Sequence, residues 1–62
     1  MLDSLFEPNT AERRAAEYIL EQASHGRTAS VREVRRAART PLDTVKAVRE
    51  KLIAAGLLKG KG

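Results

Sequence analysis

Apolar residues recur at steps of three and four in three stretches of the chain, which is the spacing of one face of an α-helix. The first helix is predicted over about 10–24, with Asn9 or Thr10 as its N-cap and Glu12 completing a capping box. Gly26 is expected to end this helix in the left-handed conformation. The residues on its predicted core face are Ala11, Ala15, Tyr18 and Ile19.

A second capping box predicts a short helix over about 31–38. Ser30 is its expected N-cap, and Glu33 stands three residues later, where its carboxylate can accept from the Ser30 backbone N–H. The inward residues of this helix are predicted to be Val31, Val34, Ala37 and Ala38.

A third helix is predicted to start at Thr40 and to run to about residue 55. Thr40 is the expected cap, and Pro41 fits the first helical position because the N–H that it lacks has no helical partner there. Gly56 is expected to stop the helix, so that Leu57 packs back on the last turn. The residues that this helix is predicted to bury are Val45, Val48 and Leu52.

Only Arg39 and Thr40 separate the second and third predicted helices, so these helices must cross sharply instead of lying antiparallel. The predicted fold is an all-α, three-helix bundle of the helix-turn-helix type. Segments 27–29 and 57–59 are short extended candidates, and their pairing would add one minimal, winged-helix-like β ladder. The predicted organisation is an N-terminal segment 1–9, a helix-turn-helix domain 10–59 and a flexible tail 60–62.

Length and composition narrow the classes of function. A chain of 62 residues makes one domain that buries only about 60% of its unfolded surface, which leaves little room for a deep active site. The chain has no cysteine and one histidine, so we expect no enzyme activity, no metal site and no cofactor. No apolar run approaches 18 residues and the first residues are acidic, so we expect a cytoplasmic protein with no membrane partner.

Charge is distributed unevenly along the chain. The formal net charge is +4. Residues 1–26 hold five acids and two arginines, a net charge of −3, whereas residues 27–62 hold ten bases and three acids, a net charge of +7. The second half is therefore the candidate surface for a polyanion such as nucleic acid.

Four arginines form the strongest functional feature of the sequence. They stand at positions i, i+3, i+4 and i+7 of one predicted helix, and they are Arg32, Arg35, Arg36 and Arg39. Like charges at this spacing destabilise an isolated helix by roughly 0.2–0.5 kcal/mol per pair, which favours an anionic partner. The alternative is a solvated face that is partly neutralised by Glu33 and by the acids of the helix over 10–24.

Two phrases of the sequence carry a family resemblance: SVREVRRAARTPLDTV over 30–45 and LIAAGLLK over 52–59. Together they resemble the helix-turn-helix of bacterial winged-helix transcription regulators, over about residues 10–59. The chain departs from that pattern in lacking a second wing strand. It also departs where the family has a small alanine, a turn glycine and an apolar turn residue, which are here Arg35, Arg39 and Thr40. A weaker resemblance is to small winged-helix proteins of the small ribosomal subunit, which bind RNA.

The resemblance implies that the front half of the third helix enters the major groove of double-stranded DNA. It implies a nucleoid-associated transcriptional regulator or a DNA-architectural or recombination accessory factor. Asp43 is unfavourable beside phosphate, and Lys46 and Arg49 have an alternative role in pairing with Glu50. The expected DNA contacts are Arg32, Arg35, Arg36, Arg39, Thr40, Asp43, Thr44, Lys46, Arg49 and Lys59.

The helix over 10–24 carries a second apolar patch, which something else must cover. One candidate is the N-terminal segment, folding back through Leu2, Leu5 and Phe6. The other is a partner, either a second copy in a symmetric dimer or a protein of a larger assembly that this chain serves as an interaction module. The candidate interface residues are Leu5, Phe6, Ala16, Leu20 and Ala23.

Overall fold

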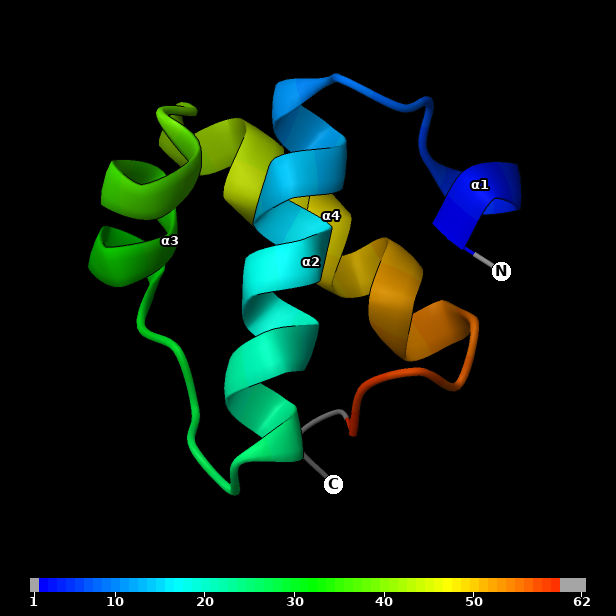
Figure 1. The fold of residues 1–62 in the computed structure, drawn as a ribbon, viewed down its shortest axis with the longest axis vertical. Helices are drawn as coiled ribbons and strands as arrows, with labels where there is room; N and C mark the ends of the chain where they lie inside the picture. Colours follow the sequence, from blue (N-terminus) through cyan, green and yellow to red (C-terminus); the bar gives the residue numbers. More distant parts are fainter. Residues whose placement is uncertain (1, 60–62) are drawn as a thin grey trace.

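Four helices make up the fold in the computed structural model, which describes residues 2–59. They are α1 (Leu2–Leu5), α2 (Ala11–Ser24), α3 (Val31–Ala38) and α4 (Leu42–Ala54). The central helix α2 packs against both α3 and α4, and α3 and α4 follow one another as a helix-turn-helix (Figure 1). The predicted all-α class is confirmed, with α1 as an additional short helix.

The start of α3 confirms the predicted capping box. The Glu33 backbone N–H donates to Ser30 Oγ at 3.2 Å, and the Ser30 N–H donates to the Glu33 carboxylate at 2.9 Å. Two donors at the helix start are thus satisfied by local sequence alone. The helix ends at Ala38, as the spacing predicts.

The predicted capping box of α2 is wrong, although the helix itself forms. Thr10 is the N-cap, and its Oγ1 accepts from the Arg13 backbone N–H at 3.1 Å. Asn9 instead holds a left-handed turn with φ of 65° before the helix. Glu12 is therefore only the second helical residue, one position too early to complete a capping box with Thr10.

The predicted cap of α4 is also wrong. Pro41, with an extended ψ of 163°, is the residue that precedes the helix, and no side chain caps its N-terminus. Thr40, the residue before Pro41, is buried, and its hydroxyl group makes no hydrogen bond in the described part of the chain. The turn between α3 and α4 draws Thr40 into the core and so keeps it from capping.

The helix ends follow the glycine signals. Gly26 and Gly56 have φ of 73° and 76°, the left-handed conformation that glycine adopts without a steric cost. After Gly56, the Leu57 N–H donates back to Leu52 O at 2.9 Å, and the Leu57 side chain packs against the core. The predicted stop of α4 is confirmed, one residue earlier than expected, at Ala54.

Small side chains let the helices approach closely around one core. The buried apolar residues are Phe6, Ala15, Ala16, Ile19, Val34, Ala38, Val45, Val48 and Leu52. The three residues predicted for α4 are confirmed. Ala37 of α3 is exposed, against the prediction, because the core covers α3 only along the line through Val34 and Ala38.

The N-terminal segment folds back on the bundle, which confirms the local alternative for the second apolar patch of α2. Phe6 is 3% exposed and belongs to the core together with Ala16. Asp3 of α1 forms an ion pair with Arg13 of α2, which fixes α1 beside the first half of that helix. Phe6 therefore completes the core, with Leu2 and Leu5 packed against it.

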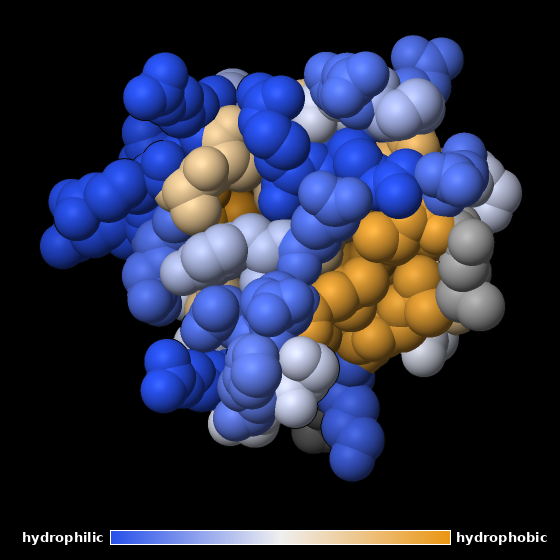
Figure 2. Space-filling view, viewed as in Figure 1, coloured by the Kyte–Doolittle hydropathy of each residue, from blue (hydrophilic) through white to orange (hydrophobic). Residues whose placement is uncertain are grey.

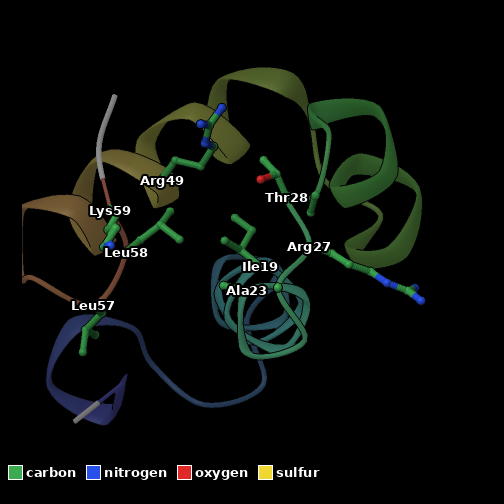
Figure 3. A pocket seen from close by; sticks show the side chains of 10 residues that line it. Ile19, Ala23, Arg27, Thr28, Arg49, Leu57, Leu58 and Lys59 are labelled. Atoms are coloured by element: carbon green, nitrogen blue, oxygen red, sulfur yellow. The ribbon is translucent and has the colours of Figure 1, made fainter. Parts of the chain in front are cut away.

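The predicted β ladder does not form within residues 2–59. Segments 27–29 and 57–59 face one another across a cavity of about 450 Å³, with Ile19 and Ala23 of α2 beside it (Figure 3). Each segment is tied to its own helix, since the Arg27 N–H donates to Gln22 O and the Leu58 N–H donates to Leu52 O. These local bonds hold the two backbones apart.

None of the described helices is both long and apolar enough to span a lipid bilayer. The predicted tail 60–62 lies outside the described residues.

Candidate nucleic-acid interface

The arginine stripe of α3, formed by Arg32, Arg35, Arg36 and Arg39, is exposed along its whole length. Arg32, Arg35 and Arg36 lie on α3, and Arg39 is the residue directly after the helix. Figure 2 shows strongly hydrophilic side chains gathered over α3 on this side of the molecule. The structure thus brings four of the predicted contact residues to one continuous surface.

No acidic residue of the described chain forms an ion pair with the arginine stripe. Glu17 pairs with Arg13, and Glu21 pairs with His25, so neither acid of α2 reaches α3. Glu33 is occupied by the capping box, whose hydrogen bonds from Ser30 lower the pKa of its carboxyl group. Direct ion pairs with the arginine stripe are therefore absent from the described residues, although the Glu33 side chain lines the same groove as Arg32 and Arg36.

The stripe borders a shallow depression of about 500 Å³ at the turn between α3 and α4. Its lining consists of the four arginines together with Thr40 and Pro41. Arg39 lies at the centre of the turn in the left-handed conformation, with φ of 52° and ψ of 54°. An L-residue other than glycine adopts this conformation at a cost of about 1 kcal/mol. An arginine therefore holds a turn position whose conformation favours glycine.

Thr40 does not offer its side chain to a groove of DNA, because it is 6% exposed. This corrects its predicted role as a base-contacting residue. Its Oγ1 atom is buried without a hydrogen-bond partner in residues 2–59. A buried hydroxyl group without a hydrogen-bond partner destabilises the folded state by about 1–3 kcal/mol.

The outward side of α4 carries a mixed surface. Asp43 and Lys46 are exposed, Thr44 and Arg49 are half-buried, and Leu42 in the first turn is exposed as well. The alternative pairing of Lys46 or Arg49 with Glu50 does not occur in the described chain. Cationic groups on α4 are therefore free to meet an external anion.

Arg49 and Lys59 lie apart from the arginine stripe. Both line the cavity between segments 27–29 and 57–59, where Arg27 forms a third basic member that the sequence reasoning missed. In Figure 3, Thr28 and Leu58 turn toward the hollow, whereas Arg27 points away from it. Arg27 follows the helix-ending glycine, and the tertiary fold brings it to the same cavity as Arg49 and Lys59.

A groove of about 340 Å³ lies on the other flank of the stripe, between α2 and α3. It is lined by Tyr18, Arg32, Glu33, Arg36 and Ala37. Tyr18, which was predicted to face the core, packs against the core and is half-buried because it also lines this groove. The signal in the sequence was its place at the edge of the apolar face of α2, next to polar positions.

The predicted partner interface is only partly available. Phe6 and Ala16 are buried in the core, which corrects their assignment to an exposed interface. Leu5 and Leu20 are half-buried, and Ala23 is exposed. Figure 2 shows an apolar surface between α2 and α1, so a smaller apolar face remains there.

Within residues 2–59, no group of three histidine, cysteine, aspartate or glutamate side chains is placed to hold a metal ion. Comparison of the chain with protein-family models, with curated proteins and with solved structures finds no match.

Proposed function

We propose that this chain is a helix-turn-helix protein that binds double-stranded DNA, as a transcriptional regulator or as an architectural or recombination accessory factor on chromosomal DNA. The observation that carries the proposal is the arginine stripe of α3, whose four guanidinium groups lack an acidic partner in the described chain. Unpaired cations at helical spacing are stabilised by a polyanion along the helix.

The proposed roles of α3 and α4 in DNA binding follow from the position of each helix. The arginine stripe of α3 contacts phosphates and sets the orientation of the protein on the duplex. The exposed first half of α4 faces a groove with Asp43 and Lys46, and Thr44 lies at the edge of this surface. A lysine donates to guanine O6 or N7, and a carboxylate accepts from cytosine N4, so this pair favours G·C base pairs.

The test is fluorescence anisotropy of a labelled random-sequence DNA duplex, titrated with the full chain at about 50 and 200 mM salt. If four or five phosphates are neutralised, log K falls with log salt at a slope of about −4. A slope near zero contradicts the proposal. A parallel titration with an RNA duplex separates DNA binding from the ribosomal-type alternative, in which RNA binds more tightly than DNA.

A charge-matched pair of variants locates the interface. Arg35→Glu lies in the stripe, and Arg14→Glu lies on the exposed side of α2, so both remove the same charge from exposed helical positions. We expect Arg35→Glu to weaken duplex binding at least tenfold and Arg14→Glu to change it little. Equal losses would show that only the net charge matters, and would contradict an interface on α3.

The apolar surface between α1 and α2 supports a second candidate function, a protein-interaction module that docks a second copy or another protein there. Leu20 is the half-buried α2 residue of the predicted interface. If the chain self-associates through this surface, we expect Leu20→Glu to convert the complex to a monomer, as measured by light scattering. The monomer should still bind duplex DNA. A chain that is monomeric before and after the substitution contradicts self-association.

A further inference from the structure

The cavity between segments 27–29 and 57–59, called the loop cavity from here on, has walls that the fold holds apart. The first segment is held by the Arg27 N–H, which donates to Gln22 O at 2.9 Å. The second is held by the Leu58 N–H, which donates to an α4 carbonyl oxygen at 3.3 Å. The loop cavity of about 450 Å³ is therefore built into the fold, and its volume is typical of small-molecule sites.

The lining of the loop cavity is largely aliphatic. Ile19 from α2 and Leu58 from the segment after α4 point into the hollow, with the Thr28 side chain beside them (Figure 3). Ala23 and Leu57 add to this lining, and no aromatic side chain of the described residues belongs to it. Aliphatic side chains without a ring to stack on favour a ligand whose body is an aliphatic chain.

The edge of the loop cavity carries positive charge. Arg49 of α4 is half-buried there and Lys59 is exposed, and both line the cavity. None of the acidic residues in the described chain lines it, and neither Arg49 nor Lys59 forms an ion pair within residues 2–59. Two cations without an internal counter-charge, beside an apolar hollow, favour a ligand with an anionic end.

We propose that the loop cavity binds a small aliphatic carboxylate. The chain of the ligand lies against Ile19, Leu57 and Leu58, and its carboxylate accepts hydrogen bonds from Arg49 and Lys59. A guanidinium group binds a carboxylate through two parallel N–H···O bonds, which gives the head group a fixed orientation. This site goes beyond the proposed function, because neither its apolar lining nor its volume is needed to bind a DNA backbone.

The experiment is an NMR titration of the full chain, with ¹³C-labelled isoleucine and leucine methyl groups, by octanoate below its micelle concentration. We expect saturable shifts of the Ile19, Leu57 and Leu58 methyl groups. Leu5 and Leu20, which lie outside the loop cavity, should shift little. The absence of saturable shifts in the cavity, or equal shifts at Leu5 and Leu20, would overturn the site, since the second result shows adsorption to any apolar surface.

Related compounds test the two ends of the ligand separately. Hexanoate lacks two methylene groups, and we expect it to bind about tenfold more weakly than octanoate. Octanol keeps the chain without the charge, and we expect it to bind at least about tenfold more weakly as well. Equal affinity for hexanoate would overturn the apolar half of the site, and equal affinity for octanol would overturn the carboxylate half.

Two matched pairs of variants locate the ligand. Arg49→Gln removes a cation from the cavity edge, whereas Arg14→Gln removes one from the exposed side of α2. Ala23→Leu fills part of the cavity, whereas Ala47→Leu adds the same side chain at an exposed position of α4. We expect the first variant of each pair to weaken octanoate binding about tenfold and the second to leave it unchanged. Equal effects within a pair would overturn the site, and each pair is a test by itself if a variant of the other fails to fold.

Duplex titrations keep this inference apart from the proposed function. A chain that binds octanoate in the loop cavity and no duplex supports the site and contradicts only the proposed function. A chain that binds duplex DNA and no octanoate overturns the site while DNA binding stands.

Discussion

The backbone N–H of Thr40 donates to the carbonyl oxygen of Arg35 at 3.2 Å, and this bond closes α3 around the left-handed residue Arg39. An arginine here is strained, because its Cβ crowds the backbone in a conformation that suits glycine. The position combines a local cost in stability with a place beside the other three arginines of the stripe, which is the pattern expected where function maintains strain.

Arg39→Gly is therefore predicted to raise the free energy of unfolding by about 1 kcal/mol and to weaken duplex binding. Arg39→Ala is the matched control, since alanine keeps the strained Cβ and loses the same guanidinium group. We expect it to weaken binding equally with no gain in stability. Urea denaturation and duplex anisotropy on both variants check this, and equal stability of the two would contradict strain at this residue.

Ser30→Ala is predicted to destabilise the protein by about 1 kcal/mol, because the Glu33 N–H loses the Oγ acceptor that caps α3. Ser24→Ala is a suitable control, since Ser24 is also exposed but lies at the end of α2 and donates only to the preceding turn. Thermal denaturation should show a clear loss for Ser30→Ala and little change for Ser24→Ala.

Acidification is predicted to reduce stability through two carboxyl groups. The hydrogen bonds from Ser30 lower the pKa of Glu33, and the hydrogen bond from Arg13 lowers the pKa of Asp3. A carboxyl group whose pKa is lower in the folded state stabilises the fold above its ordinary pKa, and this contribution is lost as the pH falls through the lower, folded value. Stability should therefore decline as the pH drops below the ordinary carboxyl range.

Glu33→Gln isolates the share of Glu33 in this decline. Glutamine can still accept from the Ser30 N–H but does not titrate, so we expect α3 to stay capped while the fall in stability at acid pH becomes smaller. Urea denaturation between about pH 7 and pH 3 measures this difference. An unchanged pH profile in Glu33→Gln would show that other groups cause the acid effect.

Phe6→Ala is predicted to destabilise the protein by about 3–5 kcal/mol, since the ring is buried in the core and alanine leaves a cavity. The Lys51 ammonium lies 5.4 Å from the ring centroid at the surface, so Lys51→Ala should cost only about 0.5–1 kcal/mol. Urea denaturation compares the two. A small effect of Phe6→Ala would show that residues 2–9 are not part of the core in solution.

The helices themselves were predictable because their signals are local. The capping box of Ser30 and Glu33, the left-handed stops at Gly26 and Gly56, and the three-and-four spacing of apolar residues each act within one or two helical turns. Three arginines of the stripe were predictable for the same reason, since a helix places positions i, i+3 and i+4 on one face, whereas Arg39 joins them from the left-handed turn after α3.

The capping box of α2 was wrong by one residue, a local error, whereas other wrong predictions depended on where a distant part of the chain lies. The sequence left open whether Phe6 and Ala16 meet a partner or pack within the chain, because it does not show that the N-terminal segment and α2 lie together in one core. The β ladder was expected from two extended segments, but the bonds that tie Arg27 and Leu58 to their own helices keep the segments apart.

The sequence by itself determined where the three long helices form and that α3 carries arginines on one face, because hydrogen bonding within a helix and helical periodicity are short-range. Only the tertiary structure decided that Thr40 is buried without a partner and that the start of α4 is left open beside those cations. The physical reason is that burial and the supply of hydrogen-bond partners depend on which surfaces meet when α3 and α4 pack on α2.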